Sequence, residues 1–159
     1  MPRALKKAKA SAGRGRPSKQ TQVLDAGVEE FLAHGYEGTT LEAIARRAGV
    51  STATVFKHYR TKASLFGAIM ARIFGEDSEA IPPGLDPAEP ARALLAVGTA
   101  YADTIRDGRI RALFRVIIAE TTRFPELGQE LYERGKKPYL DGLESFLKAA
   151  HRAKTLRVP

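Results

Sequence analysis

The stretch that most constrains this chain is residues 39–66, TTLEAIARRAGVSTATVFKHYRTKASLF. Thr39 with Glu42 three residues later has the spacing of a capping box, in which each side chain satisfies a free backbone donor at a helix start. Apolar residues then recur at helical spacing as far as Ala48. Gly49 follows, and glycine is the residue that most readily adopts the left-handed turn that ends a helix. The pattern predicts a short helix that ends at about Ala48.

A second short helix is predicted directly after this turn. Ser51 or Thr52 can cap it, and it runs to about Tyr59 with Val55 and Tyr59 facing inward. Two short helices joined by a glycine-containing turn are the pattern of a helix-turn-helix, whose second helix enters the major groove of DNA. The same pattern also occurs in helical hairpins of proteins that bind no DNA.

The exposed residues of the second helix are therefore candidates for contact with bases. Thr52, Ala53 and Thr54 lie at its start, where hydroxyl and methyl groups can meet base edges and thymine methyls. Lys57 and His58 extend this surface towards the phosphates. Between residues 40 and 75 six cations face the single acid Glu42, and this one-sided charge favours a DNA-binding function over a simple hairpin.

The motifs HGYEGTT, LEAIARRAGVS, TATVFKHY and TKASLF in residues 23–66 resemble the N-terminal domain of the TetR family of bacterial transcriptional regulators. The resemblance implies that Thr52 and Ala53 face bases. It also implies that phosphates are held by Thr40, Thr54, Phe56, His58 and Lys62. The family usually has Tyr at the position of Phe56, so one phosphate hydrogen bond is lost, and it often has Gly or Pro at that of Ala53. The full predicted DNA-binding set is Thr40, Arg47, Ser51, Thr52, Ala53, Thr54, Phe56, Lys57, His58, Tyr59 and Lys62.

The net charge of +8 is concentrated at the start of the chain. Seven of the 26 lysines and arginines lie in residues 1–19, where there is no acid. Without an apolar period, residues 1–18 are predicted to be a disordered basic tail. Arg14 and Arg16 lie in an Arg-Gly-Arg-Pro segment that resembles an AT-hook, so they are candidates for a minor-groove arm. The alternative is a tail that only adds nonspecific attraction to DNA.

The helical periodicity predicts further helices at about residues 19–34, 62–75, 88–106, 109–122 and 125–151. Pro138 is expected to kink or split the last of them. Residues 76–90 contain four prolines and are predicted to form a boundary between lobes. The predicted fold is all-α, with an N-terminal three-helix helix-turn-helix domain at 19–75 (motif about 40–59) and a C-terminal helical bundle at 76–159.

The second half contains no pattern of a catalytic or metal site. The three histidines are scattered, cysteine is absent, and there is no glycine-rich phosphate loop. We therefore expect no enzyme activity, no cofactor and no metal. The basic start is followed by no apolar run, and no stretch could span a membrane, so a cytoplasmic protein is expected.

Residues 111–135, RALFRVIIAETTRFPELGQELYERG, resemble the effector domain of the AefR-like regulators of the TetR family. The resemblance implies a small-molecule effector, and apolar pockets do form between bundle helices. The candidate lining residues are Tyr101, Phe114, Ile117 and Ile118. Family members usually continue for two more helices that build the dimer interface, so either the dimer is made differently here or the bundle is a shortened form. A homodimer on a palindromic operator is expected from the resemblance and from the few base contacts of one reader.

The sequence thus predicts a sequence-specific DNA-binding regulator, a repressor released by its ligand. Two alternatives remain open. The chain could be a nonspecific architectural DNA-binding protein driven by its tail, or a helical ligand-binding module without DNA function.

Overall fold

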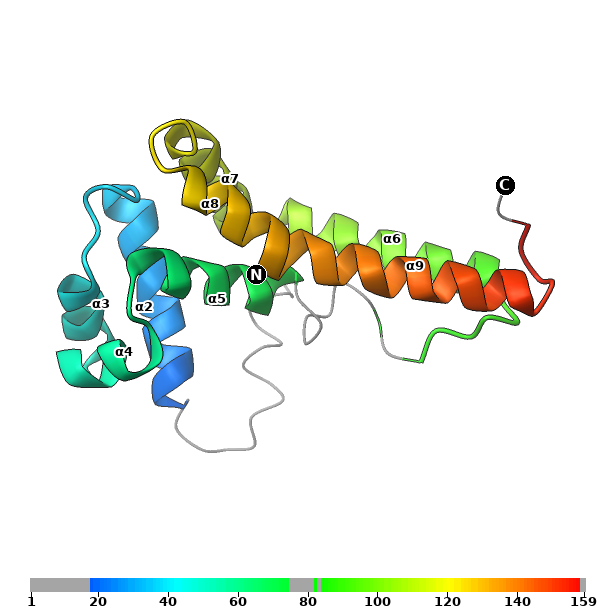
Figure 1. Ribbon diagram of the computed structural model, residues 1–159, viewed down its shortest axis with the longest axis horizontal. Helices are drawn as coiled ribbons and strands as arrows, with labels where there is room; N and C mark the ends of the chain where they lie inside the picture. Colours follow the sequence, from blue (N-terminus) through cyan, green and yellow to red (C-terminus); the bar gives the residue numbers. More distant parts are fainter. Residues whose placement is uncertain (1–17, 75–81, 83, 158–159) are drawn as a thin grey trace.

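The computed structural model describes residues 18–74, 82 and 84–157, and within them the chain is helical with no strand. Two lobes share one helix (Figure 1). The first lobe contains α2 (Lys19–His34), α3 (Leu41–Ala48), α4 (Thr52–His58) and α5 (Lys62–Phe74). The second contains α6 (Pro90–Arg106), α7 (Gly108–Glu120), α8 (Pro125–Glu130), a π-helical turn η1 (Leu131–Lys136) and α9 (Lys137–Arg152). The predicted all-α architecture is confirmed.

The helix α5 forms the centre of the molecule (Figure 1). Leu65 and Ile69 are fully buried, and Phe66 and Met70 nearly so. Their apolar stripe packs against α2 on one side and against α8 and η1 on the other. A helix that is apolar around most of its circumference must be covered on several faces. This requirement places α5 between the two lobes.

The helix boundaries of the first lobe follow from local signals. Ser18 caps α2 by accepting a hydrogen bond from the Thr21 amide at 3.1 Å. Gly49 ends α3 in the left-handed conformation, with φ of 67°. Ser51 caps α4 by accepting from the Thr54 amide at 3.2 Å. These bounds agree with the predicted ones to within a residue.

The cap of α3 was predicted at the wrong threonine. Thr40, not Thr39, accepts the hydrogen bond from the Ala43 amide, at 3.1 Å. Thr39 is buried, and its hydroxyl donates to the Gly35 carbonyl at 2.7 Å. Both residues are threonines, so the side chain alone does not identify the cap. The turn that follows α2 decides which of the two faces the start of α3.

The predicted disruption at Pro138 is present, but it takes the form of a π-helical turn. Residues Leu131–Lys136 are wound as η1 immediately before Pro138, and α9 continues from Lys137. Proline has no N–H and its ring clashes with the carbonyl four residues earlier, so the turn before it widens. The helix is thereby bent and not ended.

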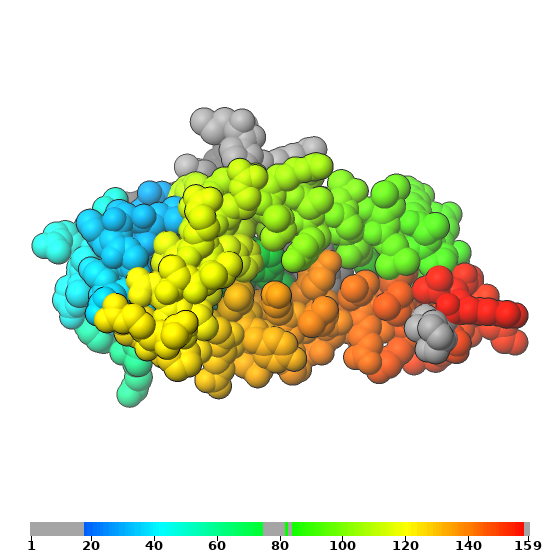
Figure 2. Space-filling model, turned by 90° about the horizontal axis from the view of Figure 1, so that it is seen from above, coloured from blue at the N-terminus to red at the C-terminus, as the bar shows by residue number. Residues whose placement is uncertain are grey.

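The helices α6 and α9 run side by side away from the first lobe (Figure 1). Ala93 and Val97 of α6 and Phe146 and Ala150 of α9 are buried. Leu140 of α9 is 49% exposed. Viewed from above, the surface is hollowed between α6 and the η1–α9 segment, with atoms of α5 at the bottom (Figure 2).

Candidate DNA-binding surface and ligand cavity

The helix α4 presents one solvent-facing side. Thr52, Ala53, Lys57 and His58 are exposed, and Phe56 is 41% exposed. Val55 on the opposite side is fully buried and fixes the helix against the lobe. The structure therefore brings together most of the side chains that were predicted to meet DNA.

The hydroxyl groups on this surface differ in whether they already make hydrogen bonds within the chain. The Ser51 hydroxyl caps α4 and also lies 2.8 Å from that of Thr54. Thr40 is engaged as the cap of α3. In the described part of the chain Thr52 has no hydrogen-bond partner for its side chain. Thr52 is therefore the hydroxyl most available to a base edge.

Two cations of the predicted DNA-binding set also have partners within the lobe. The Arg47 Nε lies 2.5 Å from Oε1 of Glu30, whose side chain is almost fully buried. Lys62 donates to the carbonyls of Tyr36 and Glu37 and lies 4.4 Å from the centroid of the Tyr36 ring. Burial lowers the pKa of Lys62, and the nearby carboxylates of Glu120, Glu37 and Glu126 partly oppose this shift.

Tyr59 is a third residue of the predicted DNA-binding set that has a partner within the lobe. Its side chain is only 5% exposed, and its hydroxyl accepts a hydrogen bond from the Gln20 amide nitrogen at 3.3 Å. The expected inward packing is confirmed, and the ring lies away from the exposed side of α4. Gln20, at the start of α2, was missed by sequence reasoning because it lies 39 residues from the residue it contacts.

An ion pair and an aromatic contact join the two lobes. Both guanidinium nitrogens Nη1 and Nη2 of Arg123 pair with the Glu37 carboxylate, at 2.6 and 2.7 Å. The hydrogen bonds from Arg123 lower the pKa of Glu37. The Tyr36 ring packs against Phe124 with centroids 5.1 Å apart. The turn before α3 is thus attached to the segment between α7 and α8.

Tyr36 lies at the middle of this junction. Its hydroxyl donates to Glu126 at 3.5 Å. Burial, followed by the charge of Glu126, raises the pKa of Tyr36 to about 12. The phenol therefore stays neutral at physiological pH beside the carboxylates of the second lobe.

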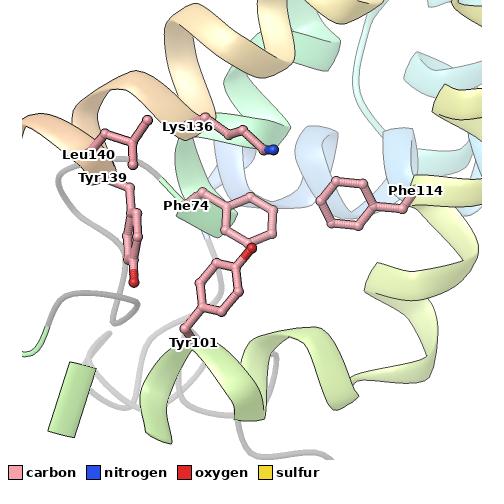
Figure 3. A pocket seen from close by; sticks show the side chains of 6 residues that line it. All are labelled: Phe74, Tyr101, Phe114, Lys136, Tyr139 and Leu140. Carbon is pink, nitrogen blue, oxygen red and sulfur yellow. The ribbon is translucent and has the colours of Figure 1, made fainter. Parts of the chain in front are cut away.

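A cavity of about 220 Å³ lies where α5, α6, α7, η1 and α9 meet. It is lined by Phe74, Tyr101, Phe114, Lys136, Tyr139 and Leu140 (Figure 3). Of the four predicted lining residues, Tyr101 and Phe114 are present. Ile117 packs in the main core and Ile118 is 74% exposed, so neither belongs to the wall. No group of three or more potential ligands for a metal occurs within the described residues.

Two family models match the chain. Residues 23–69 match the bacterial regulatory proteins of the TetR family, and residues 92–159 match the C-terminal domain of AefR-like transcriptional repressors. The solved structure of the flavonoid-responsive regulator FrrA is 30% identical, with a TM-score of 0.66, over 89% of this chain and 72% of FrrA. The chain belongs to the TetR family.

This TetR-family chain also has curated relatives. It is 25% identical over 138 residues to the repressor KstR2 of Rhodococcus jostii (strain RHA1). This match covers 77% of this chain and 68% of KstR2. Over 57 residues it is 35% identical to the activator FasR of Mycolicibacterium smegmatis (strain ATCC 700084 / mc(2)155), covering 36% of this chain and 26% of FasR. The chain is a DNA-binding transcriptional regulator, and its family is not one of enzymes. None of the helices described here has the length and apolar character to cross a membrane.

Proposed function

We propose that the chain is a repressor that binds a palindromic operator as a homodimer and is released by a small molecule held in the cavity. The exposed side of α4 and the repressor relatives support the DNA half of the proposal. Since the target is a bacterial operator, we place its action in the cytoplasm. We place the boundary between the DNA-binding domain (residues 19–75) and the ligand-binding domain (residues 76–159) after α5, where the sequence predicts it.

The observation that carries the regulatory half is that α5 takes part in both sites. Lys62 at its first turn holds the carbonyls of the α2–α3 turn. Phe74 at its last turn lines the cavity. A helix of this length extends about 20 Å and transmits a displacement as a rigid element. A ligand that displaces Phe74 would therefore move the support of α3 and α4.

We assign separate roles to the residues of the DNA surface. Thr52 and Ala53 contact bases, while Thr54, Phe56, Lys57 and His58 approach the phosphates. Arg47 and Lys62 hold α3 and the turn before it, and Tyr59 holds the end of α4 against α2. The proposed minor-groove arm with Arg14 and Arg16 lies outside the described residues.

The ligand is proposed to be aromatic. FrrA is named as flavonoid-responsive. Four of the six residues that line the cavity of this chain are aromatic. Rings in such a lining favour an aromatic ligand through offset or edge-to-face contacts.

The test is selection of duplexes from a random DNA library by the full chain, in parallel with a form lacking residues 1–17. We expect both to enrich one palindrome. A Thr52→Ala variant is expected to tolerate more bases at one position of each half-site, whereas Thr99→Ala, an exposed residue of α6, serves as the control with unchanged preference. Enrichment of no sequence by either form would contradict the proposal.

The nonspecific architectural function makes a different prediction. Binding would then fall steeply with salt, depend little on sequence and disappear with residues 1–17. A specific regulator instead retains a preference of about 10³-fold or more for its site. The same purified forms, titrated with the selected duplex and a scrambled one at two salt concentrations, separate the two functions.

A further inference from the structure

The cavity has one charged residue in an otherwise apolar and aromatic lining. We propose that it takes a single-ring aromatic carboxylate and that Lys136 is the counter-ion of this carboxylate. The proposal rests on the ligand-responsive function proposed above and adds the chemical class of the ligand and the residue that selects it.

The apolar part of the lining is built from rings at interacting distances. The Phe74 ring lies 5.5 Å from that of Phe114 and 6.4 Å from that of Tyr101. Tyr101 and Tyr139 face one another across α6 and α9 at 5.4 Å. Phe74 is 4% exposed, whereas Tyr101 is 38% exposed. The cavity therefore has an enclosed aromatic end at Phe74 and a more open end at Tyr101.

Lys136 is exposed to solvent, and its charge has no ion-pair partner within the described residues. Its neighbours in the same turns are paired: Arg134 lies 2.9 Å from Glu130, and Lys137 lies 2.8 Å from Asp141. No such partner occurs for Lys136, and the lining contains no acid. In the view of Figure 3 the ammonium group extends from η1 towards Phe74 and Phe114. A carboxylate placed there gains a charge-assisted hydrogen bond, and a cationic ligand is repelled.

The volume limits the ligand to a small molecule. A cavity of about 150 Å³ lined by apolar side chains accepts benzene. The cavity here is about 220 Å³, which leaves room for one ring and a short acidic arm. Typical sites for drug-sized ligands start at about 300 Å³, so a larger polycyclic ligand would require the walls to move.

The experiment is calorimetric titration of the full chain with trans-cinnamate, its neutral methyl ester, and octanoate as a non-aromatic acid. We expect cinnamate to bind most tightly. Lys136→Met should weaken cinnamate about tenfold and leave the ester unchanged. Lys136→Arg should restore most of the loss. Lys137→Met removes the same charge one residue away from the lining and should leave both affinities unchanged. Thermal unfolding of each variant verifies that it is folded.

Equal affinity for the acid and its ester, tighter binding of octanoate, or equal effects of Lys136→Met and Lys137→Met would overturn the assignment. Absence of binding by all three probes overturns it as well. Operator selection by the unmodified chain does not depend on these titrations, so an intact operator preference with no cinnamate binding removes the ligand class alone. Cinnamate binding that leaves operator affinity unchanged instead keeps the site and contradicts the proposed release mechanism.

Discussion

At the scale of single residues, two adjacent threonines have different tasks. Thr40 supplies the cap of α3, and Thr39 is buried with its hydroxyl on the Gly35 carbonyl. The cap matters for function because α3 supports α4. A side chain that accepts a backbone N–H at a helix start contributes about 1 kcal/mol.

The cap assignment predicts different effects for two substitutions of one residue. Thr40→Ala should lower the free energy of unfolding by about 1 kcal/mol, because the Ala43 amide loses its acceptor. Thr40→Ser keeps the hydroxyl and should stay within about 0.5 kcal/mol of the unmodified chain. Urea denaturation followed by circular dichroism measures both. Equal losses in the two variants would show that the hydroxyl does not act as a cap.

Tyr36 provides a prediction about pH. Its pKa in the folded chain is raised to about 12, from an ordinary value of about 10 in an unfolded chain. Between these values the unfolded state loses the phenol proton and the folded state keeps it, so the tyrosine's contribution to stability is complete below about pH 10 and lost towards pH 12. Lys62 acts in the opposite direction, since its pKa is lowered in the folded state.

The comparison with Tyr36→Phe isolates the tyrosine. The free energy of unfolding of the unmodified chain should fall relative to that of the variant as the pH rises from about 9 to about 11. The contribution of Lys62 is present in both proteins and largely cancels in the difference. Parallel stability curves over this range would contradict the raised pKa of Tyr36.

At the scale of elements, the contact between α5 and η1 depends on Gly67. A Cβ at this position would lie 2.8 Å from Cδ of Glu130 and 2.7 Å from Cδ of Arg134. The missing side chain lets α5 and η1 approach closely enough to bury Met70 and Gly135. This contact joins the lobe that carries α4 to the lobe that contains the cavity.

A pair of glycine substitutions tests this contact. Gly98→Ala on α6 meets nothing within 4 Å and should stabilise the chain by up to about 1 kcal/mol, as alanine favours the helix. Gly67→Ala has the same helical advantage but must displace the Glu130–Arg134 pair, and overpacking costs about 1–3 kcal/mol. We expect a net loss of up to about 2 kcal/mol in thermal or urea denaturation. Equal stabilisation by both would mean that η1 moves away freely.

At the scale of the whole molecule, the two lobes are joined by contacts between residues far apart in the chain. Arg123 and Glu37 are 86 residues apart and both exposed. Arg109 and Glu29 form a second pair between α7 and α2. Exposed pairs contribute little to global stability, so their effect is expected in the local motion of the segments that they join.

Hydrogen exchange is the measurement suited to this effect. Arg123→Gln should speed the exchange of amides in residues 35–40 several-fold, because the turn before α3 loses its attachment to the second lobe. Arg115→Gln removes the same charge from an exposed position of α7 and should leave these amides unchanged. At about 1 M salt, where charges are screened beyond about 3 Å, the difference between the variants should shrink. Unchanged exchange in Arg123→Gln at low salt would contradict the attachment.

Much of the first lobe could be predicted from the sequence because its signals are local. Ser18, Gly49 and Ser51 act on amides or turns within three or four residues, so their effects follow from spacing alone. The solvent-facing side of α4 follows in the same way, because burial of Val55 fixes which residues face outward. The resemblance to a known family added roles that spacing does not supply.

The sequence by itself determined the order of the helices, the helix-turn-helix and the class of protein. Tertiary structure decided which cations have partners within the lobe, since Arg47 and Lys62 contact residues 17 and 26 positions away in the chain. It also decided the cavity wall: Ile117 and Ile118 differ by one position, which on a helix is a rotation of about 100°, and only packing against other helices fixes which face is inward. Helices form from contacts near in sequence, whereas this cavity and the ion pairs between the lobes form from contacts between residues far apart in sequence.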